Sequence, residues 1–209
     1  MERETMGVVT KETEAVMAGG MTLDEAIKSR RSIGRVLQTA VPRHLIEEII
    51  EAACWAPSHY NTQPWRFIVM TGEGRSLLGK GYANVAAAMN PELSGEQLEE
   101  RQAKEHMKAK RAPVIIAAVC SPSADPRASF KEELAAAHAS VQNLLLAAHA
   151  KGLGAIWRSG EPMYHDAMKE TFQLTDEEQL IALIYLGYSD MPDKTSTRKA
   201  IQEVTSWVD

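Results

Sequence analysis

The sequence predicts an α+β fold in which helices surround a sheet of about four strands. Four short apolar segments, at 65–70, 114–120, 154–157 and 180–188, have the composition or the continuous apolarity of strands. Helical patterns lie between them, but there are too few alternating strand and helix units for a barrel. The 209 residues fit one ordinary domain, so we expect a single core.

The N-terminal residues 1–21 are expected to be an extension of one domain at 22–209. The boundary is the glycine-containing stretch "MAGGM" at 17–21. The segment before it carries acidic residues and no continuous apolar stretch, so it does not resemble a secretory signal. The apolar runs elsewhere are shorter than the roughly 20 residues of a membrane span. We therefore expect a cytoplasmic protein without a membrane segment.

The first helix is predicted just after this boundary. Thr22 and Glu25 have the spacing of a capping box, and Leu23, Ala26 and Ile27 give one apolar face, so the helix should end near residue 29.

The second helix is predicted to begin near Pro42, which suits a first helical turn, and to stop before Pro57. Further helical patterns cover about 75–88 and 95–111. The second of these is mostly charged, which is typical of a solvated helical face.

The longest helical pattern runs from about 129 to 151 and ends at Gly152, a favourable residue after a helix. It is rich in alanine, and a helix so long is more than a monomer of this size needs, so we expect it to pack against a partner as well. Pro162 opens a last helix that is predicted to continue to about residue 170.

Charge and cysteine content exclude several classes of function. Lys and Arg number 23 against 28 Asp and Glu, a formal charge of -5, which argues against nucleic acid as a partner. Cys54 and Cys120 lie in apolar segments without the spacing of metal ligands, so we interpret both as reduced core thiols and predict no metal site. His138 and His149 are too far apart to be ligands on one helical turn, and we interpret them as core or interface residues.

The stretch "KSRRSIGR" at 28–35 is the first candidate binding motif. Guanidinium groups and a hydroxyl, here Arg30, Arg31 and Ser32, suit a phosphate. The alternative is that basic residues simply favour a helix C-terminus. Neither a P-loop nor a dinucleotide fingerprint is present, so a phosphate would be held by side chains.

Two more polar stretches adjoin apolar segments. "APSHYNTQPWRF" at 56–67 places His59, Asn61 and Gln63 between two prolines that restrict the backbone, and "WRSG" at 157–160 follows a buried strand. The alternatives are a polar turn that satisfies its own backbone and an ordinary strand-to-helix connection. Neither a nucleophile elbow nor a placed catalytic triad is present. Together with 28–35, these stretches could bind a phosphate at one end and a planar hydrogen-bonding ring at the other, which describes FMN.

From 22 to 207, the chain resembles the FMN-dependent nitroreductase family, in particular its short bacterial NAD(P)H nitroreductases. The resemblance rests on the order and spacing of four motifs, "SRRSIGR", "APSHYNTQPWRF", "AAAHASVQNLLLAAHAKGLGAIWRSG" and "LIYLGYSD". It implies a homodimer of α+β subunits, each with a mostly antiparallel central sheet wrapped by helices. Two FMN molecules would lie at the interface, and the long helix would form much of the contact.

The resemblance also implies a set of cofactor-binding residues and no catalytic side chain. The implied FMN contacts are Arg30, Arg31 and Ser32 at the phosphate and ribityl end, Trp157, Arg158 and Ser159 along the ring, His59 from the other subunit, Asn61 and Gln63 in the loop that lines the ring, and Arg198 near the phosphate.

Two features depart from the family pattern. Trp55 stands where short relatives often carry Arg, so a polar contact from the partner could be replaced by stacking or lost. The segment 81–111, which helps to shape substrate access in the family, carries no recognisable specificity signature.

The predicted activity is transfer of hydride from NADH or NADPH to FMN, followed by reduction of a small acceptor such as a nitroaromatic or a quinone in ping-pong order. Two alternatives remain at this point. The same fold could carry out specialised flavin chemistry, with flavin as substrate, dehydrogenation or dehalogenation, or the chain could be a non-enzymatic dimeric interaction protein.

Overall fold

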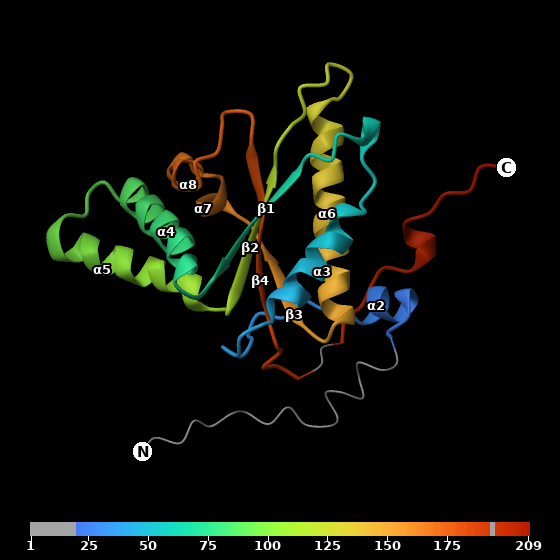
Figure 1. Cartoon of the computed structure of the whole chain (residues 1–209), viewed down its shortest axis with the longest axis horizontal. Helices are drawn as coiled ribbons and strands as arrows, with labels where there is room; N and C mark the ends of the chain where they lie inside the picture. Colours follow the sequence, from blue (N-terminus) through green and yellow to red (C-terminus); the bar gives the residue numbers. More distant parts are fainter. Residues whose placement is uncertain (1–19, 193–194) are drawn as a thin grey trace.

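A computed structural model describes residues 20–192 and 195–209, so nearly all of the predicted N-terminal extension lies outside the described residues. A four-stranded sheet forms the middle layer. Helices α3 (Arg43–Cys54) and α6 (Phe130–Ala150) cover one face, and α4 (Ser76–Met89) and α5 (Gly95–His106) lie on the other (Figure 1). The α+β prediction is confirmed.

The sheet is antiparallel throughout and has the strand order β1-β2-β4-β3. Its strands are β1 (Trp65–Thr71), β2 (Val114–Cys120), β3 (Gly154–Arg158) and β4 (Gln179–Gly187), close to the predicted segments. Every residue of β2 is buried, because this inner strand is covered on both faces, which accounts for its continuous apolarity. The edge strand β3 is short and ends at Arg158.

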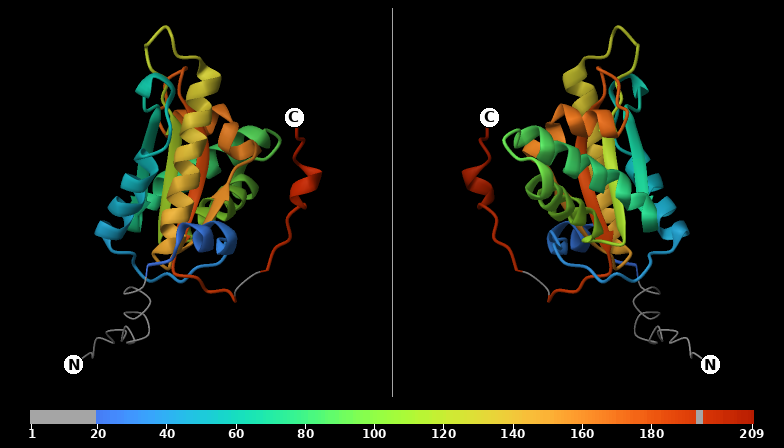
Figure 2. Two further views of the ribbon diagram at one scale, coloured as in Figure 1. Left: turned by 90° about the vertical axis from the view of Figure 1, so that its right-hand side faces the viewer. Right: turned by 90° about the vertical axis from the view of Figure 1, so that its left-hand side faces the viewer.

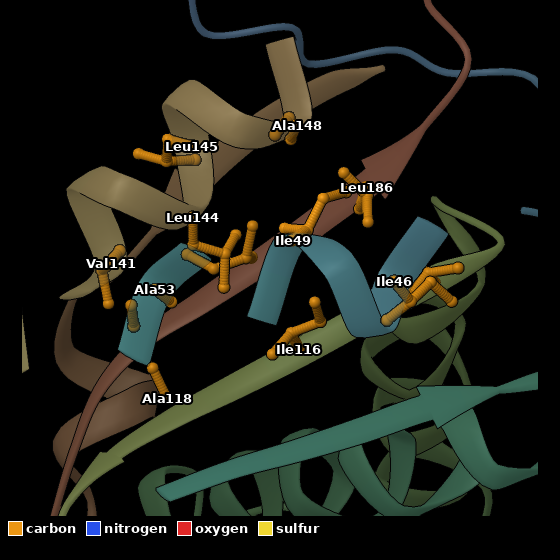
Figure 3. Packing of buried hydrophobic residues seen from close by; sticks show 14 of the residues in the cluster. Ile46, Ile49, Ala53, Ile116, Ala118, Val141, Leu144, Leu145, Ala148 and Leu186 are labelled. Carbon is orange, nitrogen blue, oxygen red and sulfur yellow. The ribbon is translucent and has the colours of Figure 1, made fainter. Parts of the chain in front are cut away.

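The core between the sheet and the helices α3 and α6 contains interlocking aliphatic side chains. Ile49 of α3, Leu144 of α6 and Ile116 of β2 are fully buried and lie in one cluster, as Figure 3 shows. Alanines on α6 let this helix lie close to the sheet, since Ala137 and Ala148 belong to the same cluster. The long helix is therefore first of all a core element of its own subunit.

The opposite layer is less regular than the sequence predicts. The charged helix α5 ends at His106 and continues as the 3-10 turn η3 (Met107–Lys110). Most residues of α5 are exposed, as the interpretation as a solvated face predicts, whereas Glu105 is buried and forms ion pairs with Arg101 and Lys108.

The predicted helix at 162–170 is two helices, α7 (Glu161–Tyr164) and α8 (Asp166–Thr171). They separate at His165, whose backbone is extended with φ -70° and ψ 141°. The ring Nδ1 of His165 accepts a hydrogen bond from the backbone N–H of Ala167 and thereby caps the second helix.

Helix α2 (Leu23–Ser29) begins with the predicted capping box, in which the Glu25 carboxylate accepts from the Thr22 N–H at 2.9 Å. Only part of its apolar face reaches the core. Ala26 is buried, but Leu23 and Ile27 are 70% and 54% exposed.

The next segment runs along the edge strand. Ser32 forms a parallel bridge with Ala155 of β3, and the Ile33 N–H donates to the Ala155 carbonyl at 2.9 Å. This pairing places the basic motif of the sequence directly beside the strand that ends in Arg158.

The remaining elements are the short 3-10 turns η1 (His59–Asn61), η2 (Gly72–Arg75) and η4 (Ile201–Glu203). The C-terminal segment that carries η4 stands apart from the other elements in both views of Figure 2. Within the described ranges, none of the helices combines the length and the apolarity that crossing a membrane requires. Cys120 is buried as predicted, whereas Cys54 at the end of α3 is exposed and is not a core thiol.

Candidate functional site

A cavity of about 410 Å³ lies beside the edge strand, between β3, β4, η3 and α7. Its walls combine aromatic rings, aliphatic side chains and three cations, and they include no Asp or Glu. In a chain with a net charge of -5, this is a locally positive pocket. The lining residues are Tyr82, Lys108, Arg111, Ile156, Trp157, Arg158, Ser159, Pro162, Met163, Leu183 and Tyr185.

Arg158 is the central polar group of this cavity. Its guanidinium carbon lies 5.1 Å from the centre of the Tyr185 ring, and its Nε atom is buried without a hydrogen-bond partner. A buried donor without a partner is unfavourable by about 1–3 kcal/mol, and an acceptor brought by a ligand or a water would remove this cost. The predicted role of this residue therefore has a physical basis in the free protein.

Arg158 lies over the ring of Tyr185, and Tyr185 in turn contacts Tyr82. Their hydroxyl oxygens are 3.4 Å apart, within hydrogen-bonding distance. Burial, followed by the neighbouring Tyr82, raises the pKa of Tyr185 far above its usual value, so the phenol remains neutral. The ring of Tyr185 thus offers its face to the cation without adding a negative charge to the cavity.

Trp157 joins the cavity to the long helix. Side chains of a strand alternate between the two faces, and Trp157 packs with the core below α6 whereas Ile156 packs with the opposite core. The Trp157 ring stacks on the His138 ring with centroids 5.6 Å apart. His138 is half-buried at the edge of the core, as predicted. Ser159, which follows Arg158 in the chain, is exposed and lines the cavity.

The basic motif lies a short distance along the same strand. Because Ser32 pairs with Ala155, three residues before Arg158, about 10 Å of strand separates them. Arg31 donates through Nη1 to the carbonyls of Lys28 and Arg30, while its Nε is buried and has no partner. Nη1 thus satisfies carbonyls at the end of α2, as the alternative interpretation of this motif predicts, and Nε is left without a partner.

Arg198 is brought beside this motif from the far end of the chain. Burial, then Arg198 and Arg31, lower the pKa of Arg30 below its ordinary value. Three guanidinium groups that repel one another are more stable when an anion lies among them. The structure therefore brings Arg198 close to Arg30 and Arg31, which lie near the other end of the chain.

The loop at 58–63 is strained and holds a fixed shape. Tyr60, Asn61 and Gln63 have φ values of 53°, 54° and 51°, which residues other than glycine rarely adopt. Ser58 Oγ accepts from the Gln63 N–H at 2.9 Å, and the Gln63 amide donates to Asn61 Oδ1 at 3.3 Å. Part of the loop satisfies itself, as the alternative interpretation of this stretch predicted, yet strain of this kind is concentrated at functional sites.

No residue of this loop lines the cavity. His59 Nδ1 is 3.9 Å from the carboxylate of Glu132 in the first turn of α6, whereas Ser29 bonds His149 in the last turn at 2.7 Å. Since 17 helical residues span about 25 Å, the loop and the basic motif lie at opposite ends of α6 (Figure 1). Trp55, which is 82% exposed, also lies outside the cavity.

Sequence reasoning missed Tyr82, Lys108, Arg111 and Tyr185 as cavity residues. Lys108 forms an ion pair with Glu105 and lies 5.6 Å from the centre of the Tyr82 ring. For Lys108 and Arg111, the available signal was the run of cations at the end of the charged segment, just before the strand at 114. The spacing of apolar residues did not indicate which distant residues these cations would lie beside. Among the described residues, no cluster of His, Cys, Asp and Glu could hold a metal ion.

Comparison with known proteins places the whole arrangement in one family. Residues 27–188 match the model of the nitroreductase family. YfhC of Bacillus subtilis, which carries the name of an NAD(P)H nitroreductase, is 32% identical over 182 residues, 87% of this chain and 91% of that protein.

Two solved structures share the fold. A nitroreductase-like family protein from Bacillus cereus matches with a TM-score of 0.74 and 28% identity, covering 91% of this chain and 98% of its own. A protein from Desulfovibrio desulfuricans in complex with FMN matches with a TM-score of 0.69 and 27% identity, covering 91% and 99%. The chain therefore belongs to the nitroreductase family of FMN-dependent NAD(P)H oxidoreductases.

Proposed function

We propose that FMN binds along β3, with its phosphate at Arg30, Arg31 and Ser32 and its ring in the cavity beside Arg158. The observation that carries this assignment is the pair of buried Nε atoms without partners, one on Arg31 and one on Arg158. Arg31 adjoins Ser32, which pairs with Ala155, and about 10 Å of strand separates Ala155 from Arg158. A ligand with an anionic group at one end and a polar ring at the other could supply an acceptor to each of these two Nε atoms.

The side chains of the site bind and orient, and none is needed as an acid or a base. When bound, FMN supplies the redox chemistry, taking a hydride equivalent from NADH or NADPH and passing two electrons to an acceptor. Arg158 places a positive charge where reduction adds electrons, which favours the reduced state. The aromatic and aliphatic walls at Trp157 and Met163 exclude water from the reacting face.

One cavity serves both partners of the reaction. The nicotinamide must leave before a nitroaromatic or quinone acceptor can enter, so turnover follows ping-pong order. We place the reaction in the cytoplasm, a location supported by two free cysteines, because disulfides are common in oxidising compartments.

The functional unit is a homodimer. The loop with His59 and the motif with Arg30 lie at opposite ends of α6, and a second copy that presents its α6 in the reverse direction would bring its own His59 loop to the FMN held at Arg30. A two-fold axis across α6 produces this arrangement and creates two equal sites. Exposed Leu23, Ile27 and Trp207 supply apolar surface for the contact.

An anaerobic absorption spectrum tests the assignment. The purified protein should carry the yellow flavin absorption, should bleach when NADH or NADPH is added, and should recover when a nitroaromatic or quinone is supplied. A colourless protein that takes up no added FMN would refute the assignment. Flavin reduction that no such acceptor reverses would instead favour the specialised flavin chemistry of the alternative.

A further inference from the structure

Arg111 lines the cavity and has no role in the FMN site proposed above. It follows η3 directly and is exposed, whereas Arg158 lies deeper. Among the described residues, no carboxylate forms an ion pair with Arg111, and no side-chain hydrogen bond involves it. It therefore stands at the mouth of the cavity as an unbalanced positive charge.

The other cations of the site have partners or assigned roles. Lys108 forms an ion pair with the buried carboxylate of Glu105, which also pairs with Arg101. Arg158 faces the ring site, and Arg30, Arg31 and Arg198 form the phosphate site. Because no acidic residue lines the cavity, an anionic group that enters from solvent would be attracted to Arg111.

The surfaces beside Arg111 favour a flat apolar body. Tyr82 contributes an aromatic ring from α4, and Ile156 and Met163 contribute aliphatic surface from β3 and α7. A ring packed here carries its substituents toward the mouth, where a guanidinium can form two parallel hydrogen bonds with a carboxylate or a sulfonate. The cavity thus combines apolar walls with an anion-binding rim.

We propose that the acceptor reduced in this cavity is an aromatic compound with a permanent anionic substituent, and that Arg111 is the residue that selects it. This inference rests on the proposed function. For a nitroarene carboxylate, NAD(P)H and one proton reduce the nitro group to a nitroso group. The nicotinamide is oxidised, one N–O bond breaks, and the oxygen leaves as water.

Steady-state kinetics of the FMN-loaded protein with a matched pair of acceptors tests this role. The pair is 4-nitrobenzoate and the neutral 4-nitrobenzamide, which have the same shape but differ in charge. For Arg111→Gln, we expect KM for the benzoate to rise about tenfold, the lower end of the range for a charge-assisted contact at an exposed position. KM for the amide should stay within about twofold.

Lys110→Gln is the control variant. Lys110 is the adjacent exposed cation and does not line this cavity, so its replacement makes the same change in net charge. It should leave the preference for the benzoate intact. An equal loss in both variants would show a general field effect and would overturn the role of Arg111.

Three other results would also overturn the inference. If Arg111→Gln loses FMN, the residue belongs to the cofactor site. If KM rises for NADPH and not for NADH or the benzoate, Arg111 binds the additional ribose phosphate that distinguishes NADPH from NADH. If both acceptors respond alike, charge is not selected. Absence of flavin reduction in the unaltered protein would instead refute the proposed function itself.

Discussion

Single residues of the site are held in arrangements that the free protein stabilises only in part. Arg158 lies over Tyr185 and keeps a buried Nε without an acceptor, and Arg30 lies beside two other guanidinium groups. Both arrangements are unfavourable until an anion or a polar ring is present. In the proposed complex, FMN would remove both costs, and this would add to its binding free energy.

Replacement of Arg30 separates binding from folding. Arg30→Ala should weaken FMN binding by about 1.5–3 kcal/mol, the range for a hydrogen bond to a charged group. The free energy of unfolding without FMN should not fall, because repulsion from Arg198 and Arg31 is relieved. Fluorescence titration with FMN and urea unfolding measure the two effects.

Arg43→Ala is the matched control for this change. Arg43 is exposed and forms an ion pair with Glu47 within α3, so its loss should leave FMN affinity unchanged. Unchanged affinity in Arg30→Ala would contradict the phosphate assignment.

At the scale of elements, the layer that forms the back of the cavity depends on close approach between helices. Gly81 of α4 leaves room for the side chain of Met168 from α8. A Cβ atom added at Gly81 would lie 2.5 Å from the Met168 sulfur, which is fully buried and cannot move into solvent. Tyr82, the next residue, lines the cavity, so the packing of α4 on α8 sets the position of this wall.

Gly81→Ala should therefore destabilise the protein although alanine favours helices. The clash costs about 1–3 kcal/mol and outweighs the helix-propensity gain of about 1 kcal/mol. Thermal unfolding should show a lowered midpoint. Gly74→Ala is the control, because nothing lies within 4 Å of the added Cβ there. Equal midpoints for both variants would show that Met168 rearranges freely.

At the scale of the whole molecule, the distance between the two ends of α6 is what supports the proposed homodimer. The loop at 58–63 adjoins the first turn of this helix and the Arg30 motif adjoins the last, so one chain presents its two groups of proposed FMN contacts at opposite ends of α6. Two copies related by a two-fold axis would complete both sites. The exposed apolar side chains of Ile201, Val204 and Trp207, the last 84% exposed, lie in a segment with little packing of its own.

Mixing two defective variants tests whether each site is shared. Arg30→Ala and His59→Ala should each bind FMN weakly alone. After unfolding and refolding together, half of the dimers combine both variants, and each has one site with both residues intact. About one quarter of all sites should then regain normal FMN affinity. Recovery that does not exceed the average of the two variants would contradict shared sites.

The site could be predicted only in part from the sequence, and particular residues show why. Trp157, Arg158 and Ser159 were found because they form a polar stretch at the end of a recognisable strand and belong to a motif shared with the family, and all three line the cavity. Arg111 was missed because it ends a charged segment whose periodicity carries no information about a distant strand. The split of the predicted helix at His165 was missed because it depends on a hydrogen bond from the Ala167 N–H to the His165 ring. Such a cap does not change the spacing of apolar residues, which was the basis of the prediction.

The sequence by itself determined the elements of this protein. The capping box at Thr22, the buried strand at 114–120 and the long helical pattern that stops at Gly152 all follow from local hydrogen bonding and from the spacing of apolar residues. Only the tertiary structure decided which side chains meet. Arg198 reaches Arg30, and Arg158 lies over Tyr185, because the chain path and the antiparallel pairing of β3 with β4 bring together residues that no local pattern connects.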